Sequence, residues 1–312
     1  MKYLIILLSS ICCNVFGQDS IKAAPAIDRG IIYITVDRGV NWTRADLGLP
    51  TDAALNTWAT KDGVVIAGTE RHGVFISSDR LKSWHSASKG LPLNARIISV
   101  VFANNLIFVG THLHGLFYSD NRGNSWLPAN KGLSNSNIRA LYHLDGIIFA
   151  GTDGGLFVSN DSGMSWKLLL NGLQINSMTS QMHELFVATN KGVLRTSDLG
   201  MNWKWIFSQG AIFAVTVDPT DIYMLDSFGK VYKAAKTTYV SIKADIFMPF
   251  HYTFRITPGG SQFFTSDWSR ALRDVNGTNE VFRANGIPED AFIGRLLDTP
   301  FGVLAAVGSD GC

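Results

Sequence analysis

The chain has 312 residues, of which 46% are hydrophobic, 17% charged and 11% aromatic. A chain of this length and apolar content can bury a full core, which excludes an intrinsically disordered tail and a peptide-sized scaffold. Its 27 basic and 25 acidic residues give a net charge of +2, and no run of five like charges occurs. This balance argues against a nucleic-acid or anionic-membrane partner held by bulk charge.

The first seventeen residues have the features of a secretory signal peptide. Lys2 gives a positive start, residues 3–16 form an apolar stretch too short to span a bilayer, and Gly17 supplies a small residue for cleavage. We therefore predict a cleaved signal peptide over residues 1–17, a lead segment over 18–29, and a secreted or periplasmic protein. A lipid anchor at Cys12 is the alternative, but Ile11 stands where a lipobox needs a small residue.

The remaining chain offers no covalent or membrane support. Cys312 is the single cysteine outside the predicted signal peptide, so no internal disulfide is expected. No later stretch reaches about 18 uninterrupted apolar residues, so no transmembrane span is expected either. Stability must come from packing.

One eight-residue pattern recurs five times: Ser or Thr, any residue, Asp, any residue, Gly, two residues, then Trp. The copies follow one another at intervals of roughly 40 residues, the period of a four-stranded propeller blade. In each copy the Asp and the hydroxyl can bond to the backbone of a tight turn, the Gly can take positive φ, and the Trp returns to the core. Leu81 replaces the Gly of the second copy and Asn121 the Asp of the third, and we expect both changes to weaken the turn. The predicted structural residues are Thr35, Asp37, Gly39, Trp42, Ser77, Asp79, Trp84, Ser119, Asn121, Gly123, Trp126, Ser159, Asp161, Gly163, Trp166, Thr196, Asp198, Gly200 and Trp203.

The segments around each copy complete a blade. Apolar runs such as residues 97–102 predict first strands, runs that end in Gly-Thr such as 107–111 predict second strands, and the run after the next Gly predicts a third. A fourth strand follows the Trp and leads to a Gly-Leu-Pro type of exit. Such exits occur at residues 48–50, 90–92, 132–134 and 286–288.

The later chain keeps the period without the motif, and the two ends complement each other. Residues 211–242 and 252–282 predict two degenerate blades. Residues 294–309 look like first and second strands, and residues 30–42 like the missing third and fourth, so together they predict a composite blade. Pairing of the ends removes exposed sheet edges. The sequence therefore predicts a single all-β domain over residues 30–312, a seven-bladed β-propeller with four-stranded blades.

The motif copies resemble the Asp-box, or bacterial neuraminidase repeat, of sialidase-like propellers, and the resemblance covers nearly the whole predicted domain. The same repeat occurs in non-catalytic relatives: photosystem II assembly/stability factor-like propellers, sortilin-type receptors and bacterial surface proteins. The resemblance implies that the motif turns are structural and lie on the face opposite the ligand site. No cofactor is predicted.

The catalytic branch of that family requires groups that are not evident here. A sialidase-like site needs an arginine cluster, a Tyr nucleophile backed by a Glu, and an Asp acid/base. The family's Arg-Ile-Pro or Arg-Leu-Pro phrase does not occur in the sequence. We expect an exported, non-catalytic scaffold or assembly factor that binds a protein or a glycan. The alternative is a glycoside hydrolase or lyase with an atypical site that uses acids such as Asp153, Asp226, Asp267 or Asp310.

The binding site is expected on the face where the loops between second and third strands meet those between blades. Arg139 and Arg295 each lie seven residues before the Gly of the following turn, which predicts matching places on two inner strands. The candidate binding residues are Arg71, His72, His112, His114, Arg139, Asp153, Lys191, Asp267, Trp268 and Arg295.

Each candidate has a structural alternative. The three histidines could be metal ligands, but no fourth ligand can be identified, so solvated loop histidines are preferred and no metal is predicted. The two arginines could bind an acidic ligand or pair with a nearby carboxylate, and pairing is preferred. Trp268 could be a stacking platform or part of the core. The ligand and the oligomeric state are not determined by the sequence.

Overall fold

The computed structural model describes residues 31–37, 40–217, 219–228, 230–236, 241–247, 271–272, 282–283, 285–288 and 291–309. The predicted signal peptide and lead segment lie outside these ranges, as do Gly39, Asp267, Trp268 and Cys312. The regular elements of the described ranges are all β-strands, and no helix that could cross a bilayer occurs there.

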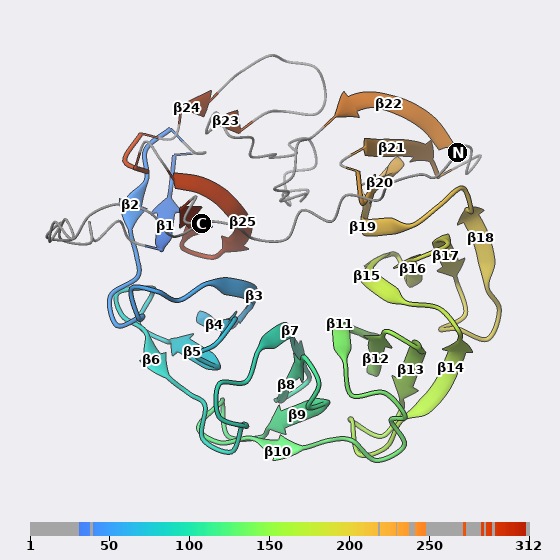
Figure 1. The fold of residues 1–312 in the computed structure, drawn as a ribbon, viewed down its shortest axis with the longest axis horizontal. Coiled ribbons are helices and arrows are strands. Elements are labelled where there is room, and N and C mark those ends of the chain that lie inside the picture. The colour runs from blue at the N-terminus through green and yellow to red at the C-terminus, as the bar shows by residue number, and fades with distance from the viewer. Residues whose placement is uncertain are drawn as a thin grey trace, which may run out of the picture.

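Six four-stranded antiparallel sheets surround a common axis, with β3, β7, β11, β15, β19 and β25 innermost (Figure 1). The predicted all-β propeller is therefore confirmed. The first blade contains β3 (Leu55–Lys61), β4 (Val64–Thr69), β5 (Val74–Ser77) and β6 (His85–Ser86); the second contains β7 (Ile97–Ala103), β8 (Leu106–Thr111), β9 (Leu116–Ser119) and β10 (Leu127–Pro128). The third contains β11 (Ile138–Leu144), β12 (Ile147–Thr152), β13 (Gly155–Ser159) and β14 (Lys167–Asn171); the fourth contains β15 (Ile175–Gln181), β16 (Glu184–Thr189), β17 (Gly192–Thr196) and β18 (Lys204–Phe207). The fifth contains β19 (Ile212–Val217), β20 (Asp221–Asp226), β21 (Lys230–Ala235) and β22 (Ser241–Phe247).

The sixth sheet joins the two ends of the chain. Strands β25 (Ala291–Thr299) and β26 (Gly302–Ser309) continue into β1 (Ile32–Thr35) and β2 (Thr43–Arg44), in the order β2-β1-β26-β25. Ile32 pairs with Ala306 and Thr35 with Val303 in an antiparallel register. The predicted composite blade is confirmed.

A two-stranded sheet, β23 (Ala271–Leu272) and β24 (Phe282–Arg283), lies between the fifth and composite blades (Figure 1). The Gly-Leu-Pro type of exit that follows β24 contacts the composite blade in the way that the other exits contact the blade after them. Asn285, just before Gly286, accepts a hydrogen bond from the Trp42 amide at 2.7 Å, and Lys131, just before Gly132, accepts one from Trp166 at 2.9 Å. The predicted seventh blade agrees with this contact, but most of residues 252–282 lie outside the described ranges, so the count of seven stays a prediction.

The hydrophobic core lies between blades. Each of five apolar clusters in the described part draws side chains from two consecutive blades. This packing explains the Gly of the Gly-Thr pair at the end of second strands. A Cβ on Gly110 would lie 2.4 Å from Cγ2 of Ile138 in the next blade. Glycine is needed for this close approach.

The five motif copies close the hairpins between third and fourth strands, as predicted. In the third blade, Asp161 accepts hydrogen bonds from the Ser159 hydroxyl at 2.7 Å and from the Ser165 amide at 2.9 Å. Asn121 makes the same contacts in the second blade, at 2.9 Å with the Ser119 hydroxyl and 3.0 Å with the Ser125 amide. The hydrogen bonds of that turn are therefore retained, and whether the turn is weaker stays a prediction.

Leu81 stands in the turn of the first blade where the other copies have Gly. Its φ of +66° is the left-handed conformation that the missing Gly would supply. Its side chain is buried, and it packs with Ile32 and Leu304 between the composite and first blades. The cost of the backbone conformation is offset by burial of this side chain.

The motif tryptophans are core residues in four copies. Trp42, Trp84, Trp126 and Trp166 are buried, and the indole of Trp126 donates to the Ala87 carbonyl of the preceding blade at 2.6 Å. Trp203 also packs against the core between the third and fourth blades, but it is only half-buried and its Nε1 has no partner. Leu169 stands where the other blades have the accepting alanine, within the longer strand β14, so this indole lacks the acceptor that the other motif tryptophans have.

Candidate functional site

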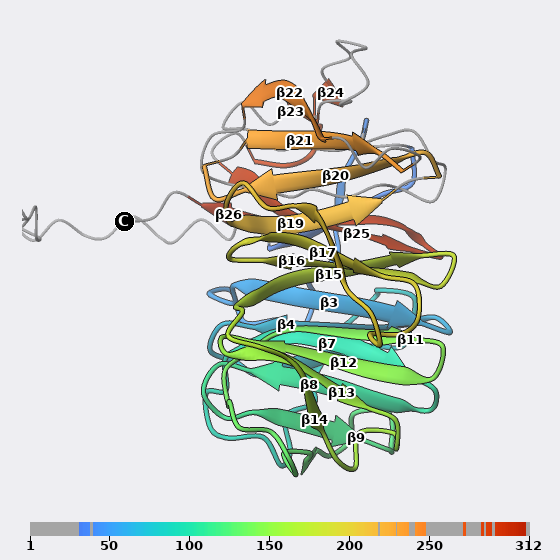
Figure 2. The ribbon, with the colours of Figure 1, turned by 90° about the vertical axis from the view of Figure 1, so that its right-hand side faces the viewer.

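The strands run across the thickness of the disc, so turns and loops gather on its two faces (Figure 2). We call the face with the first-to-second and third-to-fourth turns the motif face. The opposite face carries the second-to-third loops and the connections between blades, and we call it the loop face. The predicted binding residues that the structure describes lie on or next to the loop face.

The inner strand of each of the six four-stranded blades has a register shift, a β-bulge, near its start. The bulge is at the second residue of β3, β7, β11, β15 and β19, and at the fourth residue of β25. A bulge leaves one residue unpaired and turns its side chain away from the regular sheet. Because inner strands start at the loop face, the bulged residues surround the axis there. We call this set the bulge ring; it comprises Asn56, Ile98, Arg139, Asn176, Phe213 and Gly294.

Arg139 is the cation of the bulge ring, and it is paired. Its Nη1 lies 3.2 Å from Oδ1 of Asp153, whose Oδ2 accepts a hydrogen bond from the side-chain amide of Asn137. With its amide oxygen oriented toward the guanidinium, Gln174 of the next connection accepts from Nη1 and Nη2 at 3.0 Å. The preferred prediction of a carboxylate partner for Arg139 is confirmed, and the pairing holds the guanidinium in a defined place.

Arg295 does not match Arg139. Gly294 is the bulged residue of β25, and Arg295 pairs with Ala306, as Ala140 pairs with Gly151 in the third blade. The prediction of matching places is wrong by one residue. The reason is that Gly302 is the first residue of β26, whereas Gly146 lies within its turn.

A second polar network links the first blade to the connection that leads into the second. Oε2 of Glu70 lies 2.7 Å from Nε of Arg96 and accepts from the Asn56 amide at 2.8 Å. Sequence reasoning missed Arg96 and Asn56, as it missed Asn137 and Gln174. Each of these residues lies at the end of a connection between blades or at the start of an inner strand. An alignment of the blades at their exits would have placed these positions together.

The loop histidines do not form a metal centre. His72 and His114 occupy matching places, since their amides donate to the hydroxyls of Thr69 and Thr111 at 2.9 and 3.1 Å. Nε2 of His72 lies 3.1 Å from a carboxylate oxygen of Asp52. No group of three His, Cys, Asp or Glu side chains suited to a metal ion occurs among the residues described.

The other candidates are open to solvent or held locally. Arg71, His114 and Lys191 are exposed, and His112 is half-buried. Asp226 accepts from the amides of Phe228 and Lys230 at 2.8 and 2.9 Å.

One acceptor of the bulge ring lacks a partner. Nδ2 of Asn176 donates to the Ile212 carbonyl at 2.8 Å, but its Oδ1 is shielded from solvent without a hydrogen bond. Phe213, next in the ring, is 54% exposed. The exposed ring is suited to an apolar group of a ligand, whereas the shielded acceptor is not open to one in this conformation.

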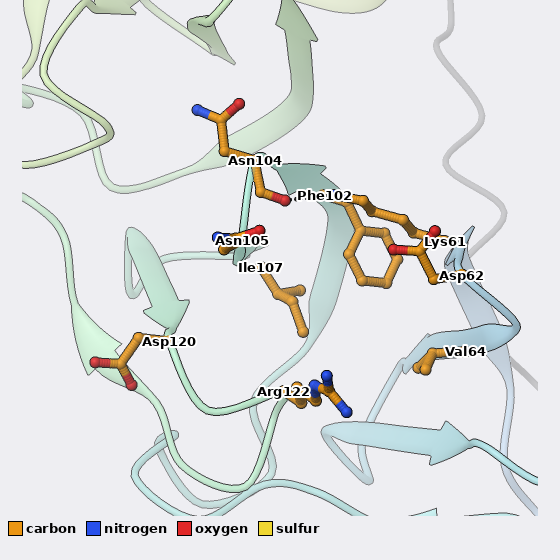
Figure 3. A pocket seen from close by; sticks show the side chains of 9 residues that line it. All are labelled: Lys61, Asp62, Val64, Phe102, Asn104, Asn105, Ile107, Asp120 and Arg122. Atoms are coloured by element: carbon orange, nitrogen blue, oxygen red, sulfur yellow. Dashed lines mark hydrogen bonds between the residues drawn. The ribbon is translucent and has the colours of Figure 1, made fainter.

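A cleft of about 400 Å³ lies on the motif face instead. Its walls come from the first and second blades (Figure 3). The sequence did not predict a site there. The lining residues are Lys61, Asp62, Val64, Phe102, Asn104, Asn105, Ile107, Asp120 and Arg122.

No family model matches the chain, and no curated protein matches it in sequence. Solved structures do match in fold. The extracellular domain of what is described as a one component system from B. thetaiotaomicron is 13% identical, with a TM-score of 0.60 over 89% of this chain and 36% of that one. An ancestral GH74 enzyme is 19% identical, with a TM-score of 0.57 over 75% of this chain and 36% of that one. YCF48 bound to D1 peptide is 14% identical, with a TM-score of 0.60 over 85% of this chain and 96% of that one.

The chain thus spans about a third of the length of the first two proteins. At these identities the likeness shows the fold alone.

Proposed function

We propose that this chain is a non-catalytic binding propeller of the Asp-box kind that holds a protein segment on its loop face. The bulge ring carries the proposal. It places two side-chain amides, an anchored guanidinium and an exposed aromatic ring around one axis. A peptide offers backbone donors, charges and apolar groups within a few ångströms, which suits this mixture.

The proposal includes export. Residues 1–17 serve as a cleaved signal peptide, residues 18–29 as a lead segment, and residues 30–312 as the propeller. The extracellular domain among the similar structures supports a place outside the cytoplasm, and the peptide complex among them supports a peptide ligand.

The described acids of the loop face favour binding over glycoside hydrolysis. A glycosidase needs two carboxyl groups free to act on one bond, about 5–10 Å apart. Asp153 is instead paired with Arg139, Glu70 with Arg96, and Asp226 bonds to the amides of its own loop. Each of these acids already accepts hydrogen bonds, which leaves it poorly placed to give a proton to a substrate.

Selection from a phage-displayed library of random peptides, with the mature protein as bait, tests this function. We expect enriched peptides whose binding weakens about tenfold or more in Phe213→Ala, because an exposed aromatic side chain is a typical anchor. Met201→Ala is the matched control, since Met201 is 85% exposed on a motif turn of the opposite face. No enrichment, or equal binding by the two variants, contradicts the proposal.

The enzyme alternative has its own test. The protein is incubated with sialyl and plant-glucan substrates, and products are followed by chromatography. Turnover that disappears in Asp153→Asn or Asp267→Asn would overturn the binding function, while saturable glycan binding without turnover would replace the peptide by a glycan.

A further inference from the structure

The cleft on the motif face has an apolar floor between two blades. Val64 starts β4 of the first blade, and Phe102 and Ile107 belong to β7 and β8 of the second (Figure 3). Ile107 is buried, and Phe102 packs against the core between these blades. The floor is therefore rigid, as a preformed ligand site requires.

Two opposite charges flank this floor. The Asp62 carboxylate and the Arg122 guanidinium lie at opposite sides of the cleft, with the apolar side chains between them (Figure 3). Both residues are exposed, and neither has a hydrogen bond or ion pair within the described part of the chain. Both have left-handed backbones, with φ of +51° and +59°, because each lies in a tight turn. The turns hold these charges apart instead of letting them pair.

The remaining polar groups do not neutralise the two charges. Lys61 donates to the Asn104 carbonyl, which ties the turn of the first blade to that of the second. The Asp120 carboxylate is directed away from the cleft (Figure 3). Asn121 stands where other motif copies have Asp, so this turn keeps its hydrogen bonds without placing a motif carboxylate next to Arg122.

We propose that this cleft binds a small zwitterion, a free amino acid or dipeptide with apolar side chains. Its carboxylate pairs with Arg122, its ammonium with Asp62, and its side chains lie on the floor formed by Phe102, Ile107 and Val64. The volume of about 400 Å³ is within the range of small-molecule sites and suits a dipeptide. A purely anionic ligand would be repelled by the Asp62 carboxylate, and a purely cationic ligand would be repelled by the Arg122 guanidinium. The site is on the opposite face from the bulge ring, so it does not depend on the proposed function.

Isothermal titration of the mature protein with Leu-Leu tests this site. We expect saturable binding that weakens about tenfold or more with N-acetyl-Leu-Leu, which lacks the ammonium, and with Leu-Leu amide, which lacks the carboxylate. Gly-Gly should bind at least about tenfold more weakly than Leu-Leu, because it covers none of the apolar floor. Equal binding of Leu-Leu and its two blocked forms would overturn the proposal, as would no saturation up to about 10 mM.

Two variants assign the charges individually. Asp62→Asn should bind Leu-Leu and N-acetyl-Leu-Leu equally, and Arg122→Gln should bind Leu-Leu and its amide equally. Asp145→Asn and Arg80→Gln are the matched controls, since they lie at the same turn positions of other blades with φ of +51° and +63°. The controls should keep the wild-type preferences. Loss of binding in the controls, or wild-type preferences in both site variants, would refute the assignment, and far-UV circular dichroism verifies that each variant is folded.

Discussion

Replacement of Gly132 by alanine tests how the blades are joined. Gly132 has φ of +89°, and a Cβ there would lie 2.2 Å from the carbonyl oxygen of Trp166 in the next blade. Gly146 offers a matched site, with φ of +81° and nothing within 4 Å of an added Cβ. The two substitutions therefore share the backbone cost and differ in the contact between blades.

The expected magnitudes follow from this difference. A left-handed alanine costs about 1–2 kcal/mol at either position. At Gly132 the clash adds about 1–3 kcal/mol. Displacement of the exit also weakens the 2.9 Å hydrogen bond from Trp166 to Lys131, for about 1 kcal/mol more. Gly132→Ala should thus lower the free energy of unfolding by about 3–6 kcal/mol, and Gly146→Ala by about 1–2 kcal/mol.

Urea titrations followed by tryptophan fluorescence measure both values. Thermal melts give a second measure, because 1 kcal/mol shifts the midpoint of a chain of this size by about 2–4 °C. Equal destabilisation by the two substitutions would refute the reasoning, since the exit would then not be held against the next blade.

Three further predictions concern the motif and a pH-dependent pair. Trp126→Ala should lower the free energy of unfolding by about 3–5 kcal/mol in urea titrations, because the side chain is buried. Hydrogen bonds from the hydroxyl and amide of Ser165, and then from Ser159, lower the pKa of Asp161 from 3.8 to about 2. Its contribution to stability is thus present above pH 3.8 and lost as pH falls through about 2, and Asp161→Asn should reduce the pH dependence of unfolding in that window. The hydrogen bond and charge of Asp145 raise the pKa of His183 above 6.5, so Asp145→Asn should lower that pKa in an NMR titration.

Each of these expectations has a contradicting result. A loss below about 1 kcal/mol for Trp126→Ala would mean that the turn matters more than its tryptophan. If the free energy of unfolding of Asp161→Asn depended on pH below 3.8 as the wild type does, the Asp161 carboxylate would not be held by the motif. For the histidine, the ion pair contributes below pH 6.5 and is lost as pH rises through the raised pKa, so an unchanged titration in the Asp145 variant would show that the pair does not form.

The periodic pattern predicted the blades because hairpin formation is local. The hydroxyl, Asp and Trp of each copy lie within eight residues, and the same contacts recur wherever that spacing does. Pairing of β1 with β26 was also predictable, since each end of the chain offered half of a blade. The burial of Leu81 and the missing acceptor for the Trp203 indole could not be predicted, because both depend on side chains from the neighbouring blade.

The candidate site was predicted less completely. Asp153 was correctly expected near a loop, and Arg139 was correctly given a carboxylate partner. Gln174, which faces the same guanidinium, belongs to the next connection and could not be found from spacing within a blade. The cleft beside Asp62 and Arg122 was missed because it joins turns of two blades about 60 residues apart in sequence.

The sequence by itself determined the all-β class, the blade period, the turn chemistry and the closure of the chain ends, because these depend on local spacing and on unpaired strand edges. Only the tertiary structure decided which residues form the bulges near the axis, which residue of β26 Arg295 pairs with, and which charges remain unpaired. Those features arise where one blade packs against the next, and the contacts that produce them join residues that no local pattern relates.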